Sequence, residues 1–341
     1  MPLVPRRLSD LPSPANLDLD TLVPPPRFGT VAFASFVPHH PSAAEAKRTV
    51  EAAAAGAVDV APAARWGRWR RRVTEGQGLY LDGGFGVGKT HLLAAAFHAA
   101  PTRSKRYLSF QELVYLIGVM GMAIARERLG DARLYCLDEF ELDDPGNTLI
   151  VKTFLAHVFA RGALVITTSN TPPEAQGEGR FNARDFVREI QSIAERFTVV
   201  SVMGPDWRQE HATGSLLPAA QVPAPQPGLV HARWTEFLDH LARHHPSRYR
   251  AQLEAAGGVV VTGVRPMADQ NDALRFVHFV DKAYDLRVPC WFEGDLALGE
   301  LFDPSFASGA YAKKYHRATS RLGEILSEAR AATPRLSAAT R

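Results

Sequence analysis

Residues 78–90 read GLYLDGGFGVGKT, and this stretch predicts the fold of the region around it. Gly83, Gly88, Lys89 and Thr90 match the phosphate-binding pattern G-x-x-x-x-G-K-[ST] at full spacing. The apolar residues before the loop indicate a short buried strand, and the residues after it indicate a helix. A glycine loop between a strand and a helix N-terminus presents main-chain N–H groups and partial positive charge to a phosphate.

Each part of this loop has a chemical role in the prediction. Its glycines let the backbone approach phosphates without a Cβ in the way. Lys89 is expected to reach the terminal phosphates, and the Thr90 hydroxyl is expected to hold magnesium. A dinucleotide motif G-x-G-x-x-G starting at Gly84 fails, because it would need glycine where Lys89 stands. The predicted nucleotide contacts in the loop are Gly83, Gly84, Phe85, Gly86, Val87, Gly88, Lys89, Thr90 and His91.

Composition and length exclude several classes of protein. The 341 residues are enough for one large or two ordinary domains, and 46% hydrophobic with 22% charged residues is typical of a soluble globular chain. A net charge of +3 is too small to indicate a polyanion partner. Cys136 and Cys290 provide no disulfide framework, which favours a reduced compartment. No secretory core is evident, and the longest uncharged apolar run, Leu113 to Ala125, is too short to span a bilayer. We therefore expect a cytoplasmic protein without a transmembrane segment.

From residue 78 onward, short apolar runs alternate with helical patterns, which predicts a parallel sheet covered by helices on both faces. Further strands are expected at 105–110, 133–137, 163–168 and 198–203, with helices at 42–55, 91–100, 111–130, 149–161 and 183–195. Beyond a Pro-rich stretch, helices are expected near 231–256, 269–285 and 310–330, with strands at 259–262 and 288–292. The predicted fold class is α/β, with a P-loop core and a second C-terminal α/β region.

An acidic strand tip is the second candidate element of the site. Residues 134–140 read LYCLDEF, an apolar run that ends in two carboxylates. Asp138 can hold magnesium, because hard cations prefer carboxylate oxygen. Glu139 can orient and polarise an attacking water. The alternative is an ordinary strand end with a solvated acidic pair, but the position in the same sheet pattern as the lysine loop favours a Walker B strand.

A polar strand tip is the third element. Residues 165–170 read VITTSN, which places Asn170 at the carboxyl edge of the predicted sheet, where ligands of open α/β sheets bind. Asn170 can hydrogen-bond both the attacking water and the γ-phosphate. The alternative is a turn asparagine before Pro172. The presence of the other two phosphate elements favours the role of a sensor.

These three elements resemble those of AAA+ ATPases, and more closely those of the ZapE-type cell-division ATPases, the Afg-like AAA+ ATPases. The matching motifs are the loop 78–90, LDEF at 137–140, TTSNTPPE at 167–174, FVHFVDKAYD at 276–285 and TSRL at 319–322, and the resemblance runs from about residue 28 to 328. It implies an ATP- and Mg²⁺-dependent hydrolase that forms a homo-oligomeric ring and remodels a protein client. The client implied by the family name is a tubulin-like division filament protein.

The resemblance also implies arginines that act on the nucleotide. A neighbouring subunit should supply one, since a planar guanidinium can neutralise charge growing on the γ-phosphate. Arg184 is the first choice and Arg180 the second, each with a surface salt bridge as the alternative. Arg321 resembles the cis arginine of the lid, and Arg317 is its substitute.

With the resemblance, the domain organisation becomes more specific. We expect a flexible N-terminal arm at 1–27, an AAA+ P-loop ATPase core at 28–210, a Pro-rich linker at 211–230, a lid-like domain at 231–330 and a tail at 331–341.

Two other functions stay open. The first is a helicase-loader-like ATPase acting on single-stranded DNA, supported only by RWGRWRRR at 65–72, a run that is more often a solvated face. A nucleic-acid partner is therefore not favoured. The second is an interaction module that binds ATP without hydrolysis, and the Asp138–Glu139 pair argues against it. His240 and His244, with His245, have a spacing that can bind zinc, but no third ligand is evident.

Overall fold

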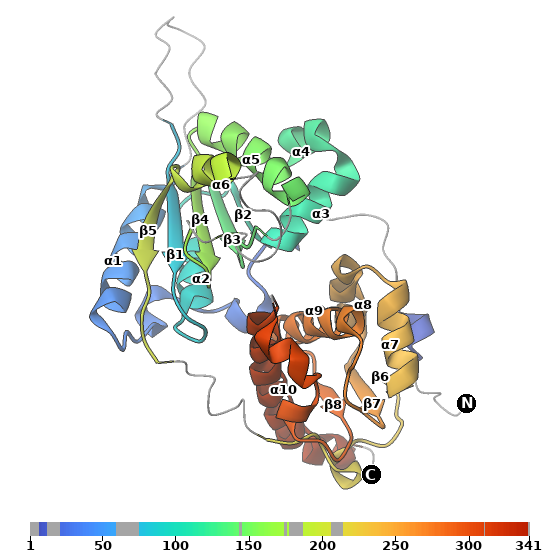
Figure 1. The fold of residues 1–341 in the computed structure, drawn as a ribbon. Helices are drawn as coiled ribbons and strands as arrows, with labels where there is room; N and C mark the ends of the chain where they lie inside the picture. Colours follow the sequence, from blue (N-terminus) through green and yellow to red (C-terminus); the bar gives the residue numbers. More distant parts are fainter. Residues whose placement is uncertain are drawn as a thin grey trace, which may run out of the picture. The chain divides into compact units, whose positions relative to one another are not determined.

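The computed structural model describes residues 7–11, 21–58, 75–142, 145–173, 176, 187–205, 214–309 and 311–339. The chain divides into two compact units, which Figure 1 shows. The P-loop unit comprises Asp18–Pro24 and Phe28–Asp206. The C-terminal unit comprises Met1–Leu17, Pro25–Arg27 and Trp207–Arg341. Within the described ranges, no helix combines the length and the apolar character that crossing a bilayer requires.

The P-loop unit is built on a five-stranded sheet in the order β2-β3-β4-β1-β5, with every pair parallel. The strands are β1 (Gly78–Asp82), β2 (Lys105–Ser109), β3 (Leu134–Asp138), β4 (Leu164–Ser169) and β5 (Phe197–Ser201). The helices are α1 (Pro41–Gly56), α2 (Lys89–Ala99), α3 (Phe110–Met120), α4 (Met122–Arg128), α5 (Pro145–Ala160) and α6 (Val187–Ala194).

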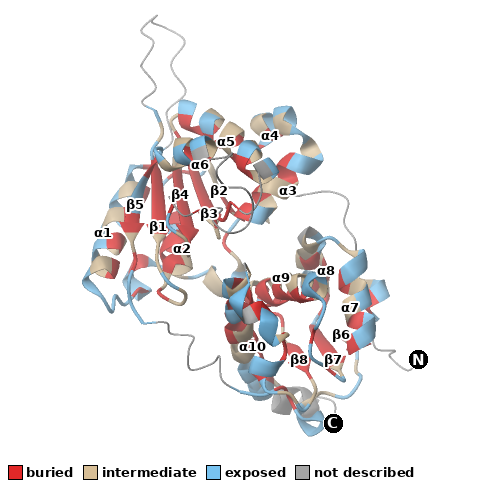
Figure 2. Cartoon of the chain, viewed as in Figure 1, coloured by how far each residue is buried: buried red, intermediate tan, exposed pale blue. Residues whose placement is uncertain are grey.

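Both faces of this sheet are covered, as the alternating pattern of its strands requires. Leu79 and Leu81 of β1 point into a core shared with α1 and α2. Tyr80 points the other way, into a core shared with α3, α5 and α6. The central strands β1, β3 and β4 are therefore buried almost throughout (Figure 2), as expected for a parallel sheet between two helical layers, whereas the edge strands β2 and β5 are less fully buried.

The helical stretch predicted at 111–130 is confirmed, but it is divided into two helices, α3 and α4. Ser109 and Glu112 start α3 with a capping box, in which each side chain bonds the main-chain N–H of the other residue. Gly121 ends α3 with a φ of 77°, a conformation that favours glycine, and α4 starts directly after it. Gly121, a glycine within an apolar helical pattern, was the feature of the sequence that indicated this break.

The C-terminal unit has a three-stranded parallel sheet in the order β6-β7-β8. Its strands are β6 (Leu229–Arg233), β7 (Gly258–Thr262) and β8 (Cys290–Phe292). Its helices are α7 (Trp234–Arg243), α8 (Tyr249–Ala255), α9 (Gln270–Leu286) and α10 (Ala312–Ala339). Phe237, Phe276 and Trp291 are fully buried in its aromatic core. The predicted fold class, a P-loop core with a second α/β region, is confirmed.

Two elements of the C-terminal unit differ from the sequence prediction. Residues 229–233 form β6, although a helix was expected from residue 231. The reason is non-local, because this short apolar run pairs with β7, with Leu229 opposite Gly258. The final helix continues to Ala339 instead of ending near residue 330. Arg27 also belongs to this unit, since its guanidinium stacks on the Tyr284 ring at 3.7 Å and forms a salt bridge with Glu328.

Candidate nucleotide site

Strand order places the three predicted elements at one edge of the P-loop unit. In the sheet, β4 lies between β3 and β1, and all three strands are parallel. Their carboxyl ends therefore meet at the same edge, which is where ligands of such sheets bind. The glycine loop follows β1, Asp138 ends β3, and Asn170 follows β4.

The glycine loop has the backbone conformation that its sequence predicts. Gly86 and Gly88 have φ values of 68° and 91°, and Gly88 is the N-cap of α2. A Cβ on Gly83 would lie 2.1 Å from the carbonyl oxygen of Val202, and one on Gly88 would lie 2.6 Å from the Phe36 ring. These two glycines therefore allow the loop to pack against β5 and the segment that precedes α1.

Lys89 is 8% exposed and holds the loop to the neighbouring strand. Its Nζ donates to the carbonyl oxygens of Gly83 at 2.8 Å and Gly84 at 2.6 Å. It also donates to Oδ1 of Asn170 at 2.9 Å. The lysine and the predicted sensor asparagine, from elements far apart in sequence, are therefore in direct contact.

Asp138 is adjacent to the loop as well. The Thr90 hydroxyl donates to its Oδ1 at 3.2 Å, and the Tyr107 hydroxyl donates to its Oδ2 at 3.1 Å. The Thr168 hydroxyl is a further donor to Oδ1. Thr90 and Asp138 together present a hydroxyl and a carboxylate side by side, which is an oxygen donor set that suits Mg²⁺. Sequence reasoning missed Tyr107, because nothing local indicates that β2 brings it to the tip of β3.

Glu139 has an unusual backbone. Its φ is 55°, a left-handed conformation that non-glycine residues adopt at a cost of about 1–3 kcal/mol. Its N–H donates to Oγ1 of Thr168 at 3.0 Å and to Oδ1 of Asp138 at 3.2 Å. The next residue donates its N–H to the Thr168 carbonyl oxygen at 2.7 Å. Strand β4 thus imposes the turn at which Glu139 leaves β3.

His91 contacts the segment before α1 with its side chain. Its Nε2 lies 3.0 Å from the Ser35 hydroxyl and 3.2 Å from the Ala32 carbonyl oxygen, and its ring meets Phe36 edge-on. Burial lowers the pKa of His91, which favours the neutral ring. Its predicted contact with nucleotide stays a prediction.

The predicted arginines fall in two groups. Arg180 and Arg184, and the Arg/Trp run at 65–72, lie outside the described residues. Arg321 and Arg317 lie in the C-terminal unit, where both guanidiniums form buried salt bridges with Asp281 at 2.6 Å and 2.7 Å. Their predicted role as cis arginines stays a prediction.

His240 and His244, the pair with a zinc-binding spacing, contact each other and neighbouring protein groups. His244 Nδ1 lies 2.9 Å from the His240 carbonyl oxygen, and the two rings stack at 4.2 Å. His240 Nε2 lies 3.2 Å from Oε1 of Gln252. Within the part of the chain that the structure describes, no group of three or more His, Cys, Asp or Glu side chains could hold a metal ion.

Two curated proteins match part of the chain. The chain is 28% identical over 155 residues to "Cell division protein ZapE" of Escherichia coli K12, with 42% of this chain and 41% of that protein covered. It is 27% identical over 154 residues to "Lactation elevated protein 1 homolog B" of Danio rerio, with 39% and 31% covered. The matched region thus spans less than half the length of these curated relatives.

Solved structures show a weaker likeness. AMPPCP-bound DnaA from Aquifex aeolicus has a TM-score of 0.38 and 16% identity, with 53% of this chain and 52% of that chain covered. The DnaI structure has a TM-score of 0.41 and 17% identity, with 55% and 98% covered.

A sequence model of the AFG1-like ATPase family matches residues 13–242 and 219–333, which is most of the chain. The predicted resemblance to Afg-like ATPases is therefore confirmed. The chain belongs to the AFG1-like ATPase family.

Proposed function

We propose that the chain hydrolyses ATP to ADP and phosphate at the edge of the P-loop unit. The observation that supports this most is the contact network in which Lys89 bonds Asn170 while the next residue, Thr90, bonds Asp138. Two such contacts between three separate strand ends leave the phosphate loop, the acidic tip and the polar tip around one position. This arrangement suits phosphoryl transfer, which depends on positioning and on stabilising charge.

Each residue has a proposed role. Lys89 and the main-chain N–H groups of the loop bind the phosphates, and Lys89 exchanges its carbonyl partners for phosphate oxygens. Thr90 and Asp138 would hold Mg²⁺, which neutralises charge on the phosphates when bound. Glu139 accepts a proton from the attacking water, and Asn170 orients that water. Arg184, or else Arg180, acts from a neighbouring subunit, and Arg321 or Arg317 acts in cis.

The test is a pair of substitutions in the full chain. Glu139→Gln should bind ATP normally but lower kcat by roughly 10²- to 10⁴-fold, because a general base is lost while the phosphate contacts remain. Lys89→Ala should lose ATP binding itself. Glu51→Gln, an exposed glutamate on α1, is the matched control and should behave as wild type. Phosphate release and binding of a fluorescent ATP analogue are measured over a range of protein concentrations.

The outcomes separate the alternatives. Normal phosphate release by Glu139→Gln would exclude Glu139 as the base. Background release by the wild type at every concentration, with ATP still bound, would favour the nucleotide-gated interaction module. Stimulation by single-stranded DNA, with a steep dependence on salt, would favour the helicase-loader-like function.

We further propose that the ATPase acts in the cytoplasm as a homo-oligomeric ring that remodels a protein client linked to cell division. The support is the family and the name of the Escherichia coli relative. Glu139→Gln in ATP should trap the client in a pull-down, and Lys89→Ala is the control that cannot hold nucleotide. Enrichment of a tubulin-like division protein in the first sample alone would support the proposal, and equal enrichment in both would contradict it.

A further inference from the structure

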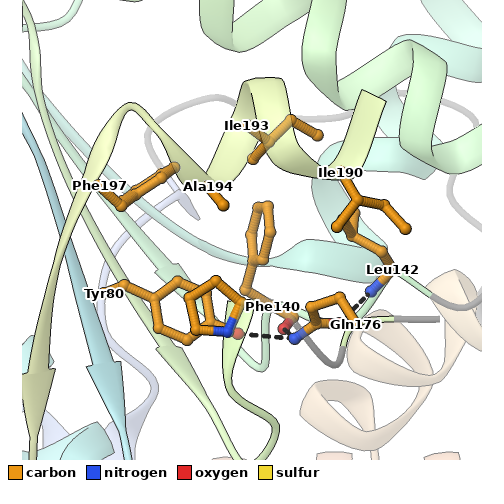
Figure 3. Close-up of a pocket in the computed structure, with 9 residues that line it drawn as sticks. Tyr80, Phe140, Leu142, Gln176, Ile190, Ile193, Ala194 and Phe197 are labelled. Carbon is orange, nitrogen blue, oxygen red and sulfur yellow. Dashed lines mark hydrogen bonds between the residues drawn. The ribbon is translucent and has the colours of Figure 1, made fainter. Parts of the chain in front are cut away.

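The side-chain amide of Gln176 links the segment that follows β3 to the segment at the end of β4. The residue follows β4 by seven positions and is only 4% exposed. Its Nε2 lies within 3.2 Å of the Tyr80 hydroxyl, the Ser169 hydroxyl and the carbonyl oxygens of Phe140 and Thr171. Its Oε1 accepts from the Leu142 N–H at 2.9 Å. Figure 3 shows the amide with its hydrogen bonds to the Tyr80 hydroxyl and the Leu142 N–H.

The partners of Gln176 flank the proposed catalytic residues. Ser169 and Thr171 are the residues on either side of Asn170. The carbonyl oxygen of Thr171 also accepts a hydrogen bond from the Tyr80 hydroxyl at 2.6 Å. Phe140 directly follows Glu139. One planar amide therefore bonds the main chain beside the sensor and the main chain beside the proposed base. A side chain needs both a donor and an acceptor to do this, and among polar side chains an amide offers both in one plane.

The surroundings make these bonds hard to replace by water. The amide lies at a pocket lined mainly by apolar side chains, including Ile190, Ile193 and Phe197, which come from α6 and β5. Burial also raises the pKa of Tyr80 far above its usual value, so its hydroxyl stays protonated and can donate. In such low-polarity surroundings, a hydrogen bond is stronger and an unpaired polar group is costlier than in water.

We propose that Gln176 is a positioning residue for ATP hydrolysis, holding Glu139 and Asn170 in a fixed mutual geometry. The inference rests on the proposed function, since it takes these two residues as the ones that activate and orient water. Gln176 itself does not touch the nucleotide in this scheme. Its loss should therefore lower turnover and leave ATP binding by Lys89 intact.

The test replaces Gln176 by methionine, which has nearly the same shape but makes no amide hydrogen bond. Gln176→Met should lower kcat by about 100-fold, the effect of a misplacement of about 1 Å at a reacting centre. The Kd for ATP should stay within about threefold of wild type, because the phosphate contacts are untouched. Gln252→Met is the matched control, since Gln252 is equally buried, 4% exposed, but lies in the C-terminal unit. The control should keep wild-type kcat.

A second measurement does not depend on activity. Amide hydrogen exchange should accelerate at residues 139–142 and 169–171 in Gln176→Met and stay unchanged there in Gln252→Met. If Gln176→Met does not fold, Gln176→Asn carries the test, because its shorter amide can reach one tip but not both. Unchanged exchange at both tips, or unchanged kcat in an active protein, would overturn the proposal. If instead Glu139→Gln hydrolyses ATP normally while exchange at the tips rises, the proposed function fails and the link between the tips stands.

Discussion

Asp138 is held by hydroxyl groups from three different elements. Thr90 comes from α2, Tyr107 from β2 and Thr168 from β4, and all three donate to its carboxylate. Thr168 has a second function, because its Oγ1 accepts the N–H of Glu139 at 3.0 Å. One threonine therefore orients the proposed magnesium ligand and holds the strained turn at the proposed base. Its neighbour Thr167 is also buried, but its hydroxyl has no hydrogen-bond partner within the described ranges.

This pair of threonines offers a test within one strand. Thr168→Val should lower the free energy of unfolding by about 1–3 kcal/mol, because it leaves a main-chain N–H and a carboxylate short of a partner. It should also lower kcat, since Glu139 loses the bond that fixes its backbone. Thr167→Val, the matched control, should be neutral or slightly stabilising, because it removes an unsatisfied hydroxyl. Urea unfolding and phosphate release measure both effects. Equal losses in the two variants would contradict this assignment.

At the scale of elements, a buried charge cluster joins α9 to α10. Asp281 of α9 accepts from Arg317 and Arg321 of α10 at 2.7 Å and 2.6 Å, and all three residues are less than 10% exposed. The two C-terminal motifs of the family resemblance thus meet in the fold, because Asp281 lies in one and Arg321 in the other. A buried ion pair contributes little to stability as a whole, but removing one partner leaves a buried charge unpaired.

Asp281→Asn should therefore be strongly destabilising to the C-terminal unit, by about 3–5 kcal/mol. Glu254→Gln is the matched control. It breaks an exposed pair with Arg250 on α8, which is typically worth about 0.3–0.5 kcal/mol. Urea unfolding with amide exchange in α9 and α10 measures the difference. A loss in Asp281→Asn no larger than in the control would show that the cluster does not hold the two helices together.

The same cluster predicts a dependence on pH. Burial alone would raise the pKa of Asp281, but the two guanidiniums, with His278, hold it well below its usual range. The carboxylate therefore stabilises the fold at pH values above the unfolded pKa of about 3.9, and this stability is lost as the pH falls below it. The difference in free energy of unfolding between wild type and Asp281→Asn should shrink as the pH falls below about 4. A difference that grew in acid would contradict the assignment.

At the scale of the whole molecule, the proposed ring makes activity a property of the assembly. An arginine supplied by a neighbour cannot act in a monomer, so the specific activity should rise with protein concentration. Arg184→Ala and Glu139→Gln should each be nearly inactive alone. Mixing them should restore part of the activity, because a subunit with an intact base then meets a neighbour with an intact arginine.

Two controls complete the mixing experiment. Arg180→Ala in place of Arg184→Ala should be active alone if Arg184 is the arginine that acts in trans. Lys89→Ala mixed with Glu139→Gln should stay inactive, because neither of the two subunits can bind nucleotide and also activate water. Restored activity in that mixture, or specific activity independent of concentration, would contradict a ring with shared sites.

The phosphate loop, the two polar strand tips and the α/β fold class were predictable from the chain alone. Each depends on residues close together in the sequence, whose spacing and backbone conformation can be predicted locally, as with the glycines around Lys89. Other features depend on which distant residues meet. Strand β6 forms because Leu229 pairs with Gly258, and Asp138 is held by Tyr107 because β2 and β3 are neighbours. Gln176 gains its role only where the ends of β1, β3 and β4 lie side by side, since hydrogen bonds between chain-distant groups depend on strand order and register and leave no periodic trace in the sequence.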